Sequence, residues 1–170
     1  GPCGPRLAIL TNGGGVGVLA VDRLIDFGGV PAELSDGTRE SLDAMLPPTW
    51  SKSNPVDIIG DADAKRYTGA LETLLEAPEV DAVLTLNVET AQASGTDIAR
   101  AVVDVVKSRR MNSIPQKPVF TVWVGDESKT SGDFNSANIP NYATETDAVR
   151  GFMHLGRHGE AIRSWMETPP

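Results

Sequence analysis

The sequence has few of the residues that form disulfides or bind metals. Cys3 is the single cysteine, and His154 and His158 are the only histidines. One cysteine excludes an internal disulfide, and such a chain is typical of a reducing compartment, so we predict a cytoplasmic location. These three side chains do not follow the spacing of metal-binding motifs, so we expect no metal site. The two histidines are predicted to lie on the surface of a helix.

Excess positive charge and long apolar runs are also missing. The chain carries 15 basic and 23 acidic residues, which gives a formal net charge of −8. Nucleic acids bind basic surfaces, so this charge disfavours a nucleic-acid partner. The longest apolar runs have only the length of a strand, which excludes a membrane-spanning helix. We therefore expect neither a nucleic acid nor a membrane as a partner.

Aromatic residues are scarce, at 5% of the chain, and the three tryptophans are too scattered to form a stacking platform. A length of 170 residues with 40% hydrophobic and 22% charged residues is typical of one globular domain with a sizeable core. The chain has no initiator methionine, opens with the segment 1–5 (Gly-Pro-Cys-Gly-Pro) and ends with 168–170 (Thr-Pro-Pro). We interpret residues 1–170 as a single domain excised from a longer multidomain chain.

Apolar segments of strand length alternate with amphipathic segments along the chain. The expected strands are 7–11, 30–34, 80–88, 118–124 and 139–143. The expected helices are 16–27, 35–45, 61–76, 96–111, a short helix or turn at 131–138, and 144–166. Such alternation with short connections requires parallel strands and right-handed crossovers. The sequence therefore predicts an α/β fold, a three-layer α/β/α sandwich with a flavodoxin-like doubly wound parallel sheet of about five strands, and the segment 144–170 is expected to lead to the next domain.

A glycine-rich segment, Asn-Gly-Gly-Gly-Val-Gly at residues 12–17, joins the first expected strand to the first expected helix. A strand that passes through glycines into a helix N-terminus presents backbone N–H groups to an anion, most often a phosphate. Because no Gly-Lys-Ser/Thr follows, a nucleoside triphosphate P-loop is excluded, and the match to a dinucleotide fingerprint is incomplete. We predict phosphate binding at Asn12, Gly13, Gly14 and Gly15. Alternatively, the glycines only permit a tight corner between strand and helix.

A second polar motif, Ser-Asn-Pro-Val-Asp, occupies residues 53–57. A residue before proline is held extended, so we expect the Asn54 side chain to point outward from a strand end. Asp57 is expected either to cap the helix that begins near Asp61 or to orient a polar ligand. Asn54 and Asp57 are thus possible supports of the site, with capping and turn formation as the alternative. No Ser-His-Asp set is visible, so no catalytic residue is expected in this segment.

These motifs, in this order, resemble the succinyl-CoA-synthetase-like flavodoxin domain of ADP-forming acetyl-CoA (acyl-CoA) synthetases, including relatives fused to a protein lysine acetyltransferase domain. The Asn-Gly-Gly and Asn-Pro-Val-Asp motifs are specific in combination, and the resemblance covers nearly the whole chain. It is carried by the segments 7–24, 32–35, 53–62, 80–86, 118–125 and 148–170.

The resemblance implies a domain of an acid–thiol ligase, which interconverts acyl-CoA, phosphate and ADP with acid, CoA and ATP. It implies that Asn12 and the three glycines after it lie at a helix N-terminus that faces a phosphohistidine. The family's histidine lies in a Ser-His-Thr-Gly setting, whereas His154 precedes Leu155 and His158 precedes Gly159. This segment alone is therefore expected to be inactive.

The resemblance also implies the reactants and partners of the parent protein. CoA, ATP or ADP, phosphate and Mg would serve the parent enzyme, with none bound tightly by this segment. The partners would be CoA-binding, ligase and ATP-grasp domains of the same protein, and the parent would be a homo-oligomer.

Two other functions stay open at this point. One is a regulatory acyl-CoA-synthetase-like domain of a protein lysine acetyltransferase. The other is a phosphate- or FMN-binding flavodoxin-like module. FMN is disfavoured because the segments 88–91 and 125–128, which follow two expected strands, contain no aromatic residue to stack on a flavin.

Overall fold

The structure is a computed structural model that describes residues 4–112, 114–125 and 127–167. Its centre is a six-stranded parallel sheet in the order β2-β1-β4-β5-β6, with β3 paired to β1. The strands are β1 (Arg6–Thr11), β2 (Val30–Pro31), β3 (Val56–Asp57), β4 (Ala82–Val88), β5 (Val119–Val124) and β6 (Asn141–Tyr142). The helices are α1 (Gly14–Asp26), α2 (Asp36–Met45), α3 (Ala64–Glu76), α4 (Gly95–Met111), α5 (Glu127–Ser136) and α6 (Glu145–Glu167).

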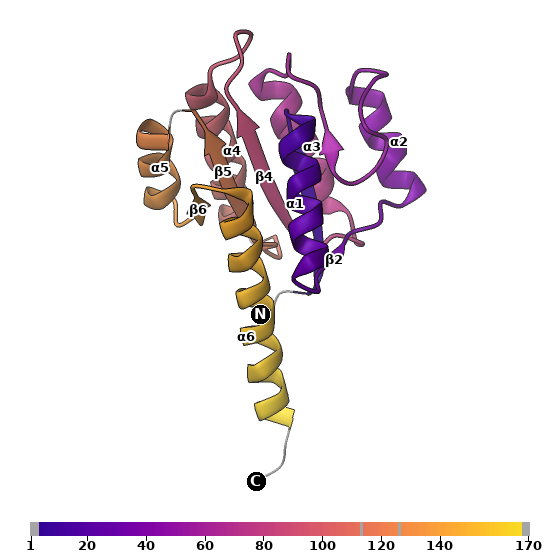
Figure 1. Ribbon diagram of the computed structural model, residues 1–170, viewed down its shortest axis with the longest axis vertical. Coiled ribbons are helices and arrows are strands. Elements are labelled where there is room, and N and C mark those ends of the chain that lie inside the picture. Colours follow the sequence, from indigo (N-terminus) through magenta and orange to yellow (C-terminus); the bar gives the residue numbers. More distant parts are fainter. Residues whose placement is uncertain (1–3, 113, 126, 168–170) are drawn as a thin grey trace.

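The helices form one layer on each face of the sheet. Helices α1 and α6 lie side by side on one face, and α2, α3, α4 and α5 cover the other (Figure 1). Each face has its own buried apolar cluster, so the two layers are held by separate cores. The predicted three-layer α/β/α sandwich with a parallel sheet is therefore confirmed.

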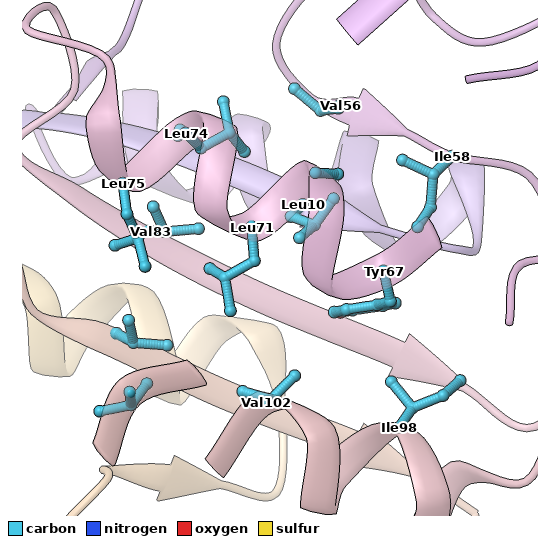
Figure 2. Packing of buried hydrophobic residues seen from close by; sticks show 14 of the residues in the cluster. Leu10, Val56, Ile58, Tyr67, Leu71, Leu74, Leu75, Val83, Ile98 and Val102 are labelled. Carbon is cyan, nitrogen blue, oxygen red and sulfur yellow. The ribbon is translucent and has the colours of Figure 1, made fainter. Parts of the chain in front are cut away.

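The larger core lies between the sheet and the pair α3 and α4 (Figure 2). Leu71, Val83 and Val102 are fully buried there, since β4 is buried on both faces and each helix presents an apolar stripe. Tyr67 is also fully buried, and its hydroxyl donates to the carbonyl oxygen of Leu86 at 2.9 Å. Burial raises the pKa of Tyr67 well above its ordinary value, so the hydroxyl remains a donor.

Two short strands share one edge of β1. Strand β2 pairs with the start of β1 through Arg6 and Leu7, and β3 pairs with its end through Leu10 and Thr11. The strands that follow β1 along the chain thus lie first on one side of it (β2 and β3) and then on the other (β4), so the strand order reverses between β1 and β4. In such sheets, ligands bind at the carboxyl ends of the strands next to this reversal.

Several element boundaries differ from those predicted. Helix α1 begins at Gly14, two residues before the predicted start, so Gly14 and Gly15 belong to its first turn. Strand β2 has two residues in place of the predicted five, and the predicted edge strand at 139–143 is reduced to β6. Helix α3 begins after Asp63, whose side chain accepts a hydrogen bond from the Arg66 N–H at 2.8 Å.

Helix α6 runs along α1 and then extends beyond the three layers (Figure 1). It covers most of the predicted terminal helix, and residues 168–170 lie outside the described part of the chain. None of the helices in the described part combines the length and the apolar character needed to cross a membrane.

Candidate functional site

The first turn of α1 is open at the carboxyl end of the sheet. Its N-cap is Gly13, which has no side chain to accept a hydrogen bond from the turn. Within the described residues, no acceptor is found for the N–H groups of Gly14, Gly15 and Val16. Helices α2, α3 and α4, by contrast, are capped by the side chains of a serine, an aspartate and a serine. The positive end of the α1 dipole and three backbone donors can therefore accept an anion.

The side chain of Asn12 is hydrogen-bonded to the backbone of the sheet. It is 3% exposed, its Nδ2 donates to the carbonyl oxygen of Val88 at 3.0 Å, and its Oδ1 accepts from the Val88 N–H at 2.8 Å. This pair of hydrogen bonds ties the end of β1 to the end of β4. Asn12 thus fixes the position of the glycines, and the free donors belong to the backbone that follows it.

The glycines of the corner differ in the space around them. A β-carbon on Gly13 would lie 2.8 Å from Val88 Cγ2, and one on Gly17 would lie 2.8 Å from Thr11 Cγ2. A β-carbon on Gly15 would meet nothing within 4 Å. Gly13 and Gly17 therefore permit close packing of α1 on the sheet, as the tight-corner alternative requires, whereas Gly15 faces open space.

Asp57 lies beside the same turn. Its Oδ2 would be 2.9 Å from a β-carbon on Gly14, and its Oδ1 accepts a hydrogen bond from the Ile59 N–H at 3.0 Å. The structure thus brings Asp57 together with the glycines, where its charge is favoured by the α1 dipole. The proposal that Asp57 caps α3 was wrong, because Asp63 is the cap residue.

The expectation that Asn54 points outward was also wrong. Its carboxamide lies in the sheet, where Oδ1 accepts from the Ile9 N–H at 2.9 Å and Nδ2 donates to the carbonyl oxygens of Leu7 and Ala32, both at 3.0 Å. The side chain fills the gap between β2 and β3 along the edge of β1, and the Asn54–Pro55 peptide is cis. Asn54 therefore supports the placement of β3 and Asp57 and does not reach the corner itself.

The loop after β3 contains a local ion pair. Arg66 donates to the Asp61 carboxylate and to the carbonyl oxygen of Ile58, the latter at 3.2 Å. This hydrogen bond from Arg66 lowers the pKa of the Asp61 carboxyl. Both charges of the pair are thus engaged with each other in the segment between β3 and α3.

A cavity of about 380 Å³ lies next to the corner, between the ends of β4 and β5 and the start of α4. Asn87, Glu89 and Trp123 are among its lining residues. Sequence reasoning missed this cavity and considered the segment after β4 only for its lack of aromatic residues. The available signal was Asn87, which with Thr85 is one of two polar residues in strand β4.

Of the two histidines, only the side chain of His154 belongs to the described part of the chain, and it does not join this site. His154 is exposed on α6, as predicted, and the side chain of His158 lies outside the described part of the chain. In the described residues, no three His, Cys, Asp or Glu side chains converge as metal ligands would.

Comparison with known proteins finds ADP-forming CoA ligases among the similar relatives. The chain is 36% identical over 157 residues to the ADP-forming acetate–CoA ligase I of Archaeoglobus fulgidus. The aligned region covers 91% of this chain and 21% of that protein. It is 34% identical over 159 residues to the alpha subunit of the ADP-forming acetate–CoA ligase I of Pyrococcus furiosus, with 91% and 33% covered. The chain thus spans a third or less of the length of these curated relatives.

Solved structures agree with the fold. A crystal structure from Pyrococcus horikoshii OT3 superimposes with a TM-score of 0.85 and 30% identity over 94% of this chain and 37% of the other. The dinucleotide-forming acetyl-coenzyme A synthetase 1 of Ca. Korarchaeum cryptofilum, in complex with phosphate and ADP, gives a TM-score of 0.83 and 27% identity over 99% and 36%. The sequence profile of the Ligase-CoA domain matches residues 7–157, and the chain therefore belongs to the Ligase-CoA domain family.

Proposed function

We propose that this chain is the flavodoxin-like domain of an ADP-forming acyl-CoA synthetase, and that the first turn of α1 holds the phosphoryl group during its transfer. The observation that carries the proposal is the set of three N–H groups, at Gly14, Gly15 and Val16, that find no acceptor in the described residues. Donors fixed in advance at a helix N-terminus stabilise a developing or transferred negative charge without reorganisation.

The similarity to acetate–CoA ligases supports the reaction class. The relatives are named as ADP-forming ligases, and one similar structure was solved with phosphate and ADP. The parent of this chain would accordingly interconvert acyl-CoA, phosphate and ADP with acid, CoA and ATP, with Mg as the metal of the nucleotide. The anion site of this domain suits the phosphate and phosphoryl groups among these reactants. In the described residues, no group of side chains is arranged to bind the metal.

Asp57 restricts where a phosphoryl group can lie. Its carboxylate stands at the Gly14 side of the turn, and like charges a few ångströms apart repel. A phosphoryl group would therefore lie over Gly15 and Val16, where no side chain is within 4 Å of the Gly15 β-carbon position. Asn12 and Asn54 would act indirectly, by fixing the corner and the Asp57 segment.

The remaining groups of the reaction would come from other parts of the parent protein. His154 is exposed on α6 and does not lie at the corner, so the phosphorylated histidine would be supplied by a ligase domain, and CoA and nucleotide would be bound by CoA-binding and ATP-grasp domains. Helix α6, which extends beyond the layers, would lead to the next domain. We further expect the parent to be a cytoplasmic homo-oligomer.

The experiment that tests the reaction class uses the full-length polypeptide that contains this chain. ADP release from ATP is measured with and without CoA and with a panel of short carboxylic acids. The proposal predicts that ADP forms over many turnovers only when both CoA and a suitable acid are present. A folded parent that forms no ADP under any of these conditions would contradict it and would favour the regulatory function instead.

A further inference from the structure

The outer face of α1 carries apolar side chains that are about half exposed. Val18, Leu19 and Ile25 are 54%, 48% and 57% exposed, and no other helix lies over this face (Figure 1). The inner face of the same helix is buried against the sheet through Ala20 and Leu24. Among the described residues, α1 therefore has apolar side chains on both faces but is covered on only one.

The sequence of the first part of α1 is typical of a helix that is covered on all sides. Residues 14–21 contain no polar side chain, and the first one is that of Asp22. A helix on the surface of a domain normally has polar residues outward, whereas a helix that is apolar all round is buried. Val18 is also β-branched, which lowers helix propensity, and its half-exposed side chain gains little packing in this domain to compensate. The pattern therefore indicates that this surface is covered in the parent protein.

Helix α4 shows how this chain forms a helix whose outer face stays in water. Its exposed side chains before Met111 are all polar, and they are those of Asp97, Arg100, Asp104, Lys107, Ser108 and Arg110. The outer face of α1 has charged groups only at its far end, at Asp22 and Asp26. The apolar outer face is thus a particular feature of α1, and it begins at the phosphoryl site.

The position of this face next to the phosphoryl site indicates what covers it. Val18 and Leu19 lie one turn after Gly15 on the same side of α1, because residues three and four apart are neighbours on a helix. The phosphorylated histidine would come from another part of the parent protein, and this chain spans a third or less of the length of its curated relatives. A domain that brings the histidine to the Gly15 N–H comes into contact with Val18 and Leu19 as well.

We propose that Val18 and Leu19 form the docking surface for the domain of the parent polypeptide that carries the phosphorylated histidine. This assignment rests on the proposed function. The docked domain covers the two side chains with apolar groups of its own and places a basic side chain opposite the exposed Asp22. Docking also excludes water from the first turn of α1, which strengthens the attraction between its free N–H groups and the phosphoryl group.

The first test measures thiol accessibility in the full-length polypeptide that contains this chain. Val18→Cys and Leu19→Cys are treated with a water-soluble maleimide, and labelling of each peptide is followed by mass spectrometry. Each rate is divided by the rate of the same cysteine in the urea-unfolded polypeptide. Met111→Cys, at an 84% exposed position of α4, is the matched control.

We expect Val18→Cys and Leu19→Cys to be labelled about tenfold or more slowly than Met111→Cys, at every polypeptide concentration, because labelling requires the docked domain to open. Labelling as fast as that of Met111→Cys would overturn the proposal. Protection that disappears on dilution would also overturn it and would identify a second copy of the polypeptide as the occupant.

The second test identifies the docked domain. A benzophenone is attached through Asp22→Cys, at the edge of the surface, and the full-length polypeptide is irradiated. We expect a cross-link to the domain that carries the phosphorylated histidine. Cross-links to another domain alone would overturn the proposal.

The third test is the turnover of Leu19→Glu in the same full-length polypeptide. A charge in the docked surface should lower acid- and CoA-dependent ADP formation about tenfold or more, whereas Leu19→Met and the control Met111→Glu should keep it. Full turnover in a folded Leu19→Glu variant would overturn the docking surface alone. An unmodified parent that forms no ADP contradicts the proposed function instead, so the two failures are distinguishable.

Discussion

Substitution of Gly14 or Gly15 by alanine has two effects on the free energy of unfolding. One is a reduced freedom of the unfolded chain, and the other is the contact of the new methyl group with neighbouring atoms. Both substitutions reduce the freedom of the unfolded chain, which stabilises a protein by about 0.4–1 kcal/mol where the native backbone accepts the new residue. A methyl group at position 15 meets nothing within 4 Å, so Gly15→Ala should retain that gain. At position 14 the methyl group would lie 2.9 Å from Asp57 Oδ2, so the carboxylate must move.

The cost of that movement can be estimated from the contacts of Asp57. Its Oδ1 accepts a hydrogen bond from the Ile59 N–H at 3.0 Å, and the loss of such a bond costs about 0.5–1.5 kcal/mol. Gly14→Ala should therefore be less stable than Gly15→Ala by about 1 kcal/mol, which is roughly 2–4 °C in Tm for a chain of this size.

The assay is equilibrium unfolding of the two variants in urea and by heating, followed by far-UV circular dichroism. A Gly14→Ala variant as stable as Gly15→Ala or more stable would refute the placement of Asp57 against the turn. Gly132→Ala serves as a control for the general effect of alanine in an exposed helix position.

Three further predictions concern the surrounding structure. Asn54→Ala leaves the Ile9 N–H and the Ala32 carbonyl oxygen without partners, while the Leu7 carbonyl oxygen still accepts from the Ala32 N–H, and should lower the unfolding free energy by about 2–4 kcal/mol in a urea titration. Gly17→Val should cost about 1–3 kcal/mol in the same assay because its side chain overlaps Thr11. Burial raises the pKa of Glu79, but hydrogen bonds from Ser35 outweigh it and lower this pKa from 4.5 to about 2. The folded-state pKa is thus depressed, so Glu79 stabilises the fold by about 1 kcal/mol above pH 4.5 and loses this effect as the pH falls toward 2. A Glu79→Gln variant should therefore be less stable than the parent chain at neutral pH and equal to it near pH 2.

The central strands were predictable because burial on both faces of a strand produces a nearly continuous run of apolar residues in the sequence. Strands β4 and β5 are almost continuously apolar, as parallel strands between two helix layers must be. Strand β2 was predicted but is shorter than expected, and β3 was not predicted, since each has only two residues and their places along β1 depend on the side chain of Asn54. A side chain that replaces backbone pairing between distant segments cannot be found from local periodicity.

The site was predictable in part for similar reasons. The glycines indicated a strand–helix corner, but their low helix propensity hid the fact that Gly14 and Gly15 belong to α1. The contact of Asp57 with the turn arises from the pairing of β3 with β1, which no short-range pattern encodes. The cavity at Asn87 requires β4, β5 and α4 to converge, so it became visible only in the folded chain.

The most direct test of the phosphoryl site is the turnover of a Gly14→Val variant of the full-length polypeptide that contains this chain. The branched side chain must displace Asp57 and crowd the three free N–H groups, while the strands and the two cores are left intact. We predict that acid- and CoA-dependent ADP formation falls by about 100-fold or more, as expected when donors to a transferred negative charge are disturbed. The matched Gly132→Val variant should keep its turnover, and unfolding curves should confirm that both variants are folded. Unchanged turnover in a folded Gly14→Val variant would contradict the assignment of the α1 first turn as the phosphoryl site.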